Sequence, residues 1–185
     1  GVLQPVVDFA VLAHAVGAIL HTDAAQSAGK VPLKVRELGV DLLSVAGHKL
    51  YAPKGVGALY VRRGTPIAPF VLGAGHERGL RPGTENVAAI VGLGMACEIA
   101  GSDMETVATR VAALRDDLWQ RLEAAVPGAM LNGHRTLRLP NTLNVRFPRV
   151  SGNTILAGAP TIAASTGSAC HAGGESASAV LLAMG

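Results

Sequence analysis

Charged residues are scarce in this chain of 185 residues, at 16%, whereas hydrophobic residues make up 49%. Sixteen basic and thirteen acidic side chains give a net charge of +3, and they are spread without long runs of one sign. So much apolar material with so little charge argues against a disordered chain and predicts a globular protein with a buried core. Because no concentrated basic surface is evident, we expect no nucleic-acid partner.

Long apolar runs are missing as well. No stretch of 18 or more uninterrupted apolar residues occurs, and the first residues, GVLQPVVDFA, lack a positively charged leader region and a cleavage site. These absences predict a soluble, cytoplasmic protein without a membrane partner. There is no initiator methionine, and the last residues, AVLLAMG, are typical of a helix that reaches a glycine stop. We therefore expect a chain that is cut at both ends.

Cysteine is rare, with only Cys97 and Cys170 in a chain too large to need a disulfide, so nothing indicates an oxidising compartment. Cys97 stands in the apolar run IVGLGMACEIA, which predicts a small buried side chain. Cys170 stands among small and polar residues in STGSACHAGG, which predicts an accessible loop. The cysteines and the six histidines show no HExxH or CxxC spacing, so we expect no metal site.

The first half of the chain alternates helical and strand patterns. QPVVDFAVLAHAVG has apolar residues at helical spacing and ends in Gly17, and three apolar runs of strand length follow: AILHTD, DLLSVAG and GALYVRR. Residues 24–40 separate the first two runs, which is long enough for a crossover between parallel neighbours. This alternation predicts an α/β layer structure.

The second half begins with a loop over residues 73–86, GAGHERGLRPGTEN, which is rich in glycine and charge. VAAIVGLGMACEIAG then predicts one helix, and a 3.6-residue period predicts a second helix over about residues 103–125. TLNVRF and TIAAS are further strand candidates. We place a domain boundary near Gly101, which divides the chain into residues 1–101 and 102–185.

Lys49 is the first candidate for chemistry, because SVAGHK is an apolar strand that ends in glycine and then presents a histidine and a lysine. In an open α/β sheet, ligands bind outside the carboxyl ends of the strands. A lysine beside apolar walls has its ammonium form disfavoured, so its free amine can form a Schiff base with an aldehyde cofactor. A surface lysine that extends into solvent is the alternative.

Asp23 is the second candidate, because it ends the preceding strand run AILHTD and would lie at the same edge of the sheet. A carboxylate there can keep the pyridine nitrogen of pyridoxal phosphate protonated. Gln26 would lie on the same side of the following turn, within reach of the phenolic oxygen of that cofactor. The alternative for HTDAAQ is an aspartate that caps a helix, and the spacing alone leaves both interpretations open.

Four motifs, HTDAAQSAGK, SVAGHKLYAPKGVGALYVRR, GAGHERGLRPGTEN and TGSACHAG, occur here in one order. In that order they resemble the class V aminotransferase superfamily of fold-type I pyridoxal-phosphate enzymes, and specifically its cysteine desulfurase branch. The resemblance extends over essentially the whole chain. It implies an α/β fold with a partial mixed sheet of the large, cofactor-binding domain in residues 1–101. Residues 102–185 would form part of an α+β small domain that carries the cysteine loop, and the fold would be truncated at both ends.

The resemblance also implies a role for individual residues. Lys49 matches the lysine that bonds the cofactor, Asp23 the partner of the pyridine nitrogen, and Gln26 the residue at the phenolic oxygen. His48 matches a residue near the cofactor phosphate. Thr84, in RPGT, matches a threonine that reaches the phosphate of the other subunit's cofactor, so the resemblance implies a homodimer.

Cys170 matches the nucleophile on a mobile loop. The resemblance implies conversion of L-cysteine to L-alanine, with the sulfur passing to Cys170 as a persulfide and then to a sulfur acceptor or an Fe–S scaffold protein. A thiolate is the reactive form, so Cys170 needs a lowered pKa or a nearby base, and the adjacent His171 is a candidate. His76, in GHERG, is expected to form hydrogen bonds within its loop rather than to bind a metal.

Ala46 departs from the pattern, because many desulfurases have a phosphate-binding serine three residues before the lysine. Selenocysteine lyases share this feature, together with RPGTEN, RLPNT and SACH, so a lyase acting on L-selenocysteine is an alternative. An ordinary class V transaminase or lyase, in which Cys170 is incidental, and a non-catalytic fragment are further alternatives. The resemblance places a glycine-rich phosphate loop and a ring-stacking histidine before Gly1, and a carboxylate-binding arginine after Gly185, so we expect an incomplete site.

Overall fold

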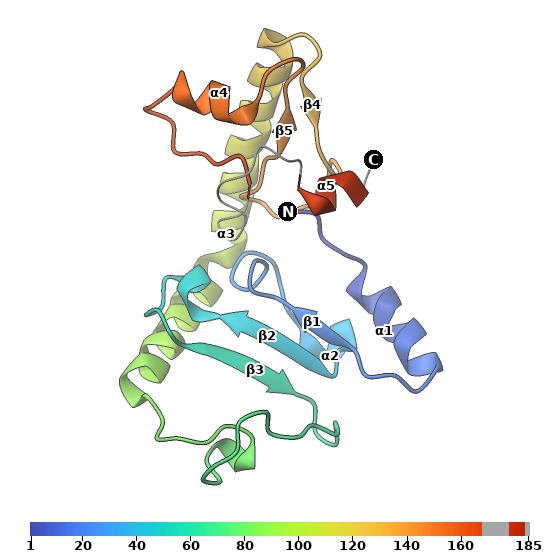
Figure 1. Cartoon of the computed structure of the whole chain (residues 1–185), viewed down its shortest axis with the longest axis vertical. Helices are drawn as coiled ribbons and strands as arrows, with labels where there is room; N and C mark the ends of the chain where they lie inside the picture. The colour runs from blue at the N-terminus through green and yellow to red at the C-terminus, as the bar shows by residue number, and fades with distance from the viewer. Residues whose placement is uncertain (168–177, 184–185) are drawn as a thin grey trace. The chain divides into compact units, whose positions relative to one another are not determined.

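The computed structural model describes residues 1–167 and 178–183. The chain forms two compact units, one from Leu3–Arg110 and the other from Gly1–Val2 together with Val111–Gly185. A single helix, α3, belongs in part to each unit (Figure 1). The proposed division into domains 1–101 and 102–185 stays a prediction.

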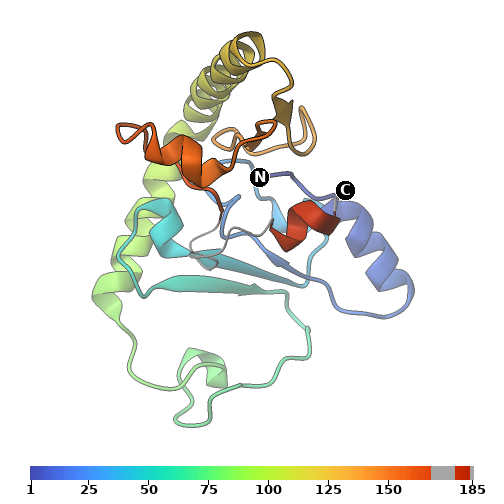
Figure 2. The same cartoon turned by 45° about the horizontal axis from the view of Figure 1, so that its top comes forward.

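The first unit contains a mixed sheet of three strands, β1 (His21–Asp23), β2 (Leu42–Ala46) and β3 (Gly57–Val61). The parallel pair is β1 with β2, and the antiparallel pair is β2 with β3. Figure 2 shows the three strands side by side in one layer. All three predicted strands are confirmed, and the chain between β1 and β2, which includes the short helix α2 (Val35–Leu38), makes the expected crossover between parallel neighbours.

The core of this unit lies on one face of the sheet. Side chains alternate between the faces of a strand, so Leu43 points to one face and its neighbours Leu42 and Ser44 to the other. Leu43 is 3% exposed and packs with Val40, which is fully buried. On the opposite face, Leu59 lies in register with Ser44 and is 49% exposed. One face of the sheet is therefore packed, and the other is open in the described residues.

The helix α1 (Val6–Ala15) ends where the sequence predicts. Gly17 has a φ of 72°, in the left-handed region that glycine adopts without steric cost, and its N–H donates to the carbonyl of His14. The glycine therefore terminates the helix and turns the chain toward β1.

The helix α3 (Val87–Ala125) differs from the sequence prediction, which had two helices separated near Gly101. Ser102 does not cap a new helix, because its hydroxyl donates back to the carbonyl of Ile99 at 2.9 Å. Glycine inside a helix costs only about 1 kcal/mol relative to alanine, so Gly101 alone does not end the helix. The prediction of two helices was wrong, and α3 is continuous.

The apolar composition of α3 also explains a second wrong prediction. Cys97 was expected to be buried but is exposed on α3. An 18-residue window of this helix has a mean hydropathy of 1.4, yet only 11% of the window is buried. By length and composition alone α3 meets the criterion for a membrane span, which core helices of soluble proteins also meet. The apolar sequence of α3 therefore does not determine which of its side chains are buried.

In the second unit, β4 (Met130–Leu131) and β5 (Val145–Arg146) form an antiparallel pair. Beside this pair lies the buried side chain of Arg138, whose guanidinium donates to the carbonyls of His134 and Asn132 at 2.7 Å each. These bonds satisfy a charged group that would otherwise be costly to bury. The guanidinium therefore fixes the loop between the two strands.

Two short helices complete the described part of this unit, α4 (Gly152–Ala157) and α5 (Ala179–Ala183). The hydroxyl of Ser151 accepts a hydrogen bond from the amide of Thr154 and so caps α4. The strand predicted for TIAAS, residues 161–165, is wrong, because these residues do not form a strand. A strand needs a hydrogen-bonding neighbour, and none of the strands in the described residues pairs with this segment.

Asp41 fixes the amino-terminal end of β2. Its carboxylate accepts hydrogen bonds from the amide of Leu20 at 2.9 Å and from Nε2 of His14 at 2.8 Å, and Nε of Arg62 lies at 3.5 Å. The Leu20 amide, followed by the His14 hydrogen bond, lowers the pKa of Asp41 from its usual value. A carboxyl group with a lowered pKa stabilises the fold above the pKa of the unfolded chain, and this stabilisation is lost as the pH falls through the folded-state pKa.

We expect Asp41→Asn to lower the thermal unfolding temperature of the complete protein by roughly 2–4 °C at pH 7, because the charge that Leu20 and His14 bind is removed. The difference between variant and unaltered protein should shrink as the pH falls below the ordinary aspartate pKa of about 4 and through the lowered folded-state pKa of Asp41. Thermal unfolding followed by circular dichroism over a pH series measures this. Asp8→Asn, on the exposed surface of α1, is the control, and an equal loss at every pH would contradict the role of Asp41.

Candidate active site

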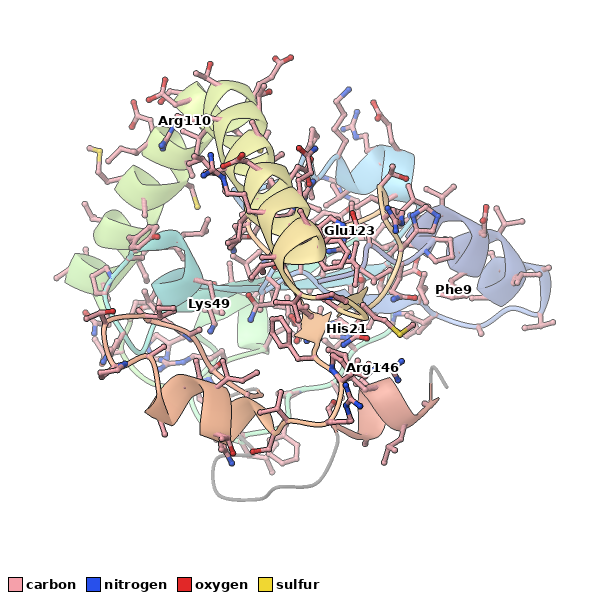
Figure 3. The ribbon with its side chains drawn as sticks, turned by 90° about the horizontal axis from the view of Figure 1, so that it is seen from above. Phe9, His21, Lys49, Arg110, Glu123 and Arg146 are labelled. Carbon is pink, nitrogen blue, oxygen red and sulfur yellow. The ribbon has the colours of Figure 1, made fainter. Side chains whose placement is uncertain are left out.

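Lys49 lies on η1 (Gly47–Leu50), a single 3-10 turn that directly follows β2. The turn is tight because the amide of Gly47 donates to the carbonyl of Val56 at 3.0 Å, and a Cβ at Gly47 would lie 2.6 Å from that oxygen. Leu50 is buried and anchors the turn in the core, whereas Lys49 is exposed. Figure 3 labels Lys49 on this turn. Its amine is therefore open to a ligand at the carboxyl end of β2.

Asp23 ends β1 at the same edge of the sheet. It lies in register with Ser44 of the parallel neighbour β2, and the amide of Ala24 donates to the Ser44 carbonyl at 2.9 Å. Its Oδ1 accepts a hydrogen bond from the amide of Ala25 at 2.8 Å. The alternative interpretation expected a helix cap, but residues 25–30 form turns rather than a helix. The bond to Ala25 is a local turn contact, and it uses only one oxygen of the carboxylate. Oδ2 has no hydrogen-bond partner among the residues that the structure describes.

Gln26 is exposed on the turn that follows Asp23. The turn is closed by a hydrogen bond from the amide of Ala28 to the carbonyl of Ala24 at 2.9 Å. Gly29 has a φ of 70° and lies so close to the side chain of Leu50 that a Cβ there would collide with it. The turn that carries Gln26 therefore packs directly against η1, which carries Lys49.

His21 lies on the same strand as Asp23, and the sequence reasoning did not single it out. Its Nε2 lies 2.8 Å from the hydroxyl of Ser44, and this contact joins β1 to β2 on the open face of the sheet. Because strand side chains alternate, His21 and Asp23 point to the same face. The HTD motif indicates this shared face in the sequence, because its first and third residues are two positions apart on one strand. His21 therefore lies on the same open face of the sheet as Asp23.

The loop between β3 and α3 runs beyond the β3 edge of the sheet (Figures 1 and 2). It contains η2 (Glu77–Gly79) and the exposed Thr84. The guanidinium of Arg81 donates to the carbonyls of Gly83 at 2.9 Å and Thr84 at 3.4 Å, so the RPGT segment folds on itself. The role of Thr84 toward a cofactor in a second subunit stays a prediction, as does that of the exposed His48.

His76 lies in the same loop, and its Nδ1 is buried without a hydrogen-bond partner in the described residues. The loop hydrogen bonds expected of its side chain are therefore not made through this atom. Within the described ranges no group of three or more metal-ligating side chains occurs. Cys170 and His171 lie outside the described residues.

The groups at the carboxyl edge of β1 and β2 have complementary chemistry. Lys49 supplies an exposed primary amine, which can condense with an aldehyde. Asp23 supplies a carboxylate that can hold a proton on a ring nitrogen, and Gln26 supplies an amide that can donate a hydrogen bond. Burial lowers the pKa of the nearby Lys30 from its usual value, and the charge of Lys49 contributes to the same direction.

Comparison with known proteins agrees with this geometry. The family described as "Aminotransferase class-V" matches residues 1–182. A protein named cysteine desulfurase, from Gluconacetobacter diazotrophicus, is 49% identical over 186 aligned residues, which cover the whole of this chain and 46% of the relative. The chain thus spans about half the length of the curated relatives it matches.

Solved structures give the same result. A NifS-like protein superposes with a TM-score of 0.79 at 40% identity, over 85% of this chain and 44% of that one. The structure titled "SspA in complex with cysteine" superposes with a TM-score of 0.73 at 33% identity, over 93% of this chain and 47% of that one. These likenesses confirm the expected α/β fold of fold-type I pyridoxal-phosphate enzymes, of which this chain represents a part. The chain belongs to the class-V aminotransferase family and, within it, to the cysteine desulfurase branch.

Proposed function

We propose that the protein containing this chain is a pyridoxal-phosphate-dependent cysteine desulfurase. It converts L-cysteine to L-alanine and transfers the sulfur to Cys170. The observation that carries the proposal is that Lys49 and Asp23 lie at one edge of the sheet, at the ends of two parallel strands. The chain that holds them is 49% identical to a protein named cysteine desulfurase. Fold alone does not specify a reaction, so the side chains at this edge carry the argument.

The side chains at this edge fit pyridoxal phosphate. The amine of Lys49 would bond the cofactor aldehyde. Oδ2 of Asp23, which has no partner in the described part of the chain, would face the ring nitrogen. Gln26 would donate to the phenolic oxygen, while His48 would lie near the phosphate. When bound, the cofactor supplies an electron sink for the substrate carbon. Asp23 serves this chemistry by holding the proton on the ring nitrogen.

Cys170 would receive the sulfur. Its thiolate forms a bond to the sulfur of the substrate, and the carbon–sulfur bond breaks with its electron pair staying on carbon. That carbon then takes up a proton, which gives alanine, while Cys170 keeps the sulfur as a persulfide. The substrate is supported by the relative whose structure is titled as a complex with cysteine.

The remaining partners follow from the family resemblance. Thr84 would contact the cofactor of a second subunit, so the active form would be a homodimer. A persulfide must be passed on, and a sulfur acceptor or an Fe–S scaffold protein would take it. We place the protein in the cytoplasm, with no nucleic-acid or membrane partner, because its charge is spread and no stretch of 18 uninterrupted apolar residues occurs. The apolar helix α3 has a composition that core helices of soluble proteins share.

Ala46 favours one alternative function, a selenocysteine lyase. It is the last residue of β2, directly before the turn that carries Lys49, and it pairs in register with Gly57. Alanine cannot donate the phosphate hydrogen bond that a serine would give at this position. A selenocysteine lyase would use the same lysine and a similar cysteine loop, so an assay with both substrates is needed to separate the two functions.

We expect Asp23→Asn to retain most of the bound cofactor but to lower turnover roughly 100-fold, or about 2.7 kcal/mol in the activation barrier. Asparagine keeps an oxygen for the Ala25 amide but cannot form an ion pair with a protonated ring nitrogen. Cofactor absorbance and alanine production from L-cysteine measure the two effects separately. Asp103→Asn, on the exposed surface of α3, should change neither, and unchanged turnover in Asp23→Asn would exclude the proposed role.

We expect Cys170→Ser to bind cofactor and L-cysteine normally while sulfur release falls by roughly three or more powers of ten, because a hydroxyl is a much weaker nucleophile than a thiolate. Cys97→Ser is a matched control, since Cys97 is an exposed thiol on α3. Alanine and sulfide are measured from L-cysteine, and alanine and selenide from L-selenocysteine. Full activity of Cys170→Ser on cysteine would show that Cys170 is not the acceptor, and consumption of selenocysteine alone would favour the lyase.

A further inference from the structure

Ser44 of β2 makes two contacts to the end of β1, one on each side of Asp23. Its hydroxyl lies 2.8 Å from Nε2 of His21, two residues before Asp23. Its carbonyl accepts a hydrogen bond at 2.9 Å from the amide of Ala24, the residue after Asp23. Asp23 itself lies in register with Ser44. A single residue of β2 therefore holds the chain of β1 both before and after the candidate carboxylate.

The two contacts lie in different surroundings. Ala24 is buried and packs in the core with Val40 and Leu43, whereas His21 and Asp23 are exposed on the open face. Strand β1 has only three residues and, among the strands that the structure describes, pairs with β2 alone. A short strand with one neighbour has few backbone bonds to hold it, so a side-chain bond contributes a large share of what fixes its position.

The contact between His21 and Ser44 does not depend on the tautomer of the ring. A serine hydroxyl can accept a hydrogen bond from a protonated Nε2 or donate one to an unprotonated Nε2. Beyond Asp23, the amide of Ala25 donates to Oδ1 of Asp23 at 2.8 Å. The direction of the other oxygen, Oδ2, therefore follows from how firmly residues 21–25 are held on β2.

We infer that His21 is a positioning residue for Asp23, which it holds in place through the hydroxyl of Ser44. The inference rests on the proposed function, in which the carboxylate of Asp23 faces the ring nitrogen of the cofactor. His21 contacts neither substrate nor cofactor in this account. It fixes β1 against β2 on the open face, so that Oδ2 keeps one direction while Oδ1 is bound by the amide of Ala25.

A double-variant comparison separates a role through Asp23 from a general effect on the fold. We expect His21→Ala to lower the turnover of the complete, cofactor-loaded protein roughly 3- to 10-fold with little change in KM for L-cysteine, as for the loss of one hydrogen bond. In the Asp23→Asn background the same substitution should cause no further loss, because the charge that His21 positions is already absent. His21→Gln, whose side-chain nitrogen can take the place of Nε2, should restore most of the turnover.

A second measurement uses cofactor-free protein. Because the amide of Ala25 donates to Asp23, its hydrogen-exchange rate, followed by NMR, reports whether the carboxylate is held. We expect His21→Ala to raise this rate roughly 3- to 10-fold and His21→Gln to restore it. The amide of Arg62, which donates to the carbonyl of Asp41 at 2.8 Å at the other end of β2, should keep its rate.

Ser44→Ala removes the other half of the same contact and should give both results, which keeps the inference testable if His21→Ala does not fold. His134→Asn is the control for the loss of a histidine, because asparagine keeps an acceptor for the two amides that bind Nδ1 of His134, and it should change neither readout. An equal fold-loss of turnover in both backgrounds, or an unchanged exchange rate at Ala25, would overturn the inference. Absence of any cofactor absorbance in the unaltered protein would instead contradict the proposed function.

Discussion

The candidate site depends on the parallel pairing of β1 with β2. Carboxyl ends of parallel strands meet at one edge, so Asp23 and Lys49 arrive together although the whole crossover separates them in sequence. The register is fixed by the core, since a slip of one residue would turn the open face of β1 into the packed face of the sheet. At the end of β2, Gly47 and Gly57 allow backbone approaches that a Cβ would block. These constraints fix where Lys49 emerges.

The charged groups at the two ends of β2 differ in whether they are paired with one another. At the amino end, Asp41 is bonded to His14 and paired with Arg62, and a cavity of about 320 Å³ is lined by these same residues. Their charges satisfy one another, so this end stabilises the fold. At the carboxyl end, Lys49 is exposed and Asp23 has one oxygen without a partner in the described residues. Groups left unpaired at a sheet edge are available for a ligand, which is why we propose the carboxyl end as the active site.

Much of this arrangement could be predicted from the sequence, because short apolar runs bounded by glycine and the length of the crossover determine the strands and their direction. The errors concern side-chain contacts. Gly101 looked like a break, but the bond from Ser102 back into the helix continues α3. The exposure of Cys97 depends on what covers α3, and the hydrogen-bonding contact of His21 depends on Ser44 across the strand pair. Neither is encoded locally. The roles toward the cofactor came from the family resemblance rather than from spacing.

The central claim is that Lys49 bonds the cofactor. Borohydride reduction of the complete protein loaded with pyridoxal phosphate, followed by proteolysis and mass spectrometry, measures this directly, because reduction makes the bond between lysine and cofactor permanent. The account predicts a pyridoxyl group on Lys49 alone. A pyridoxyl group on Lys30, Lys34 or Lys54 instead would contradict it.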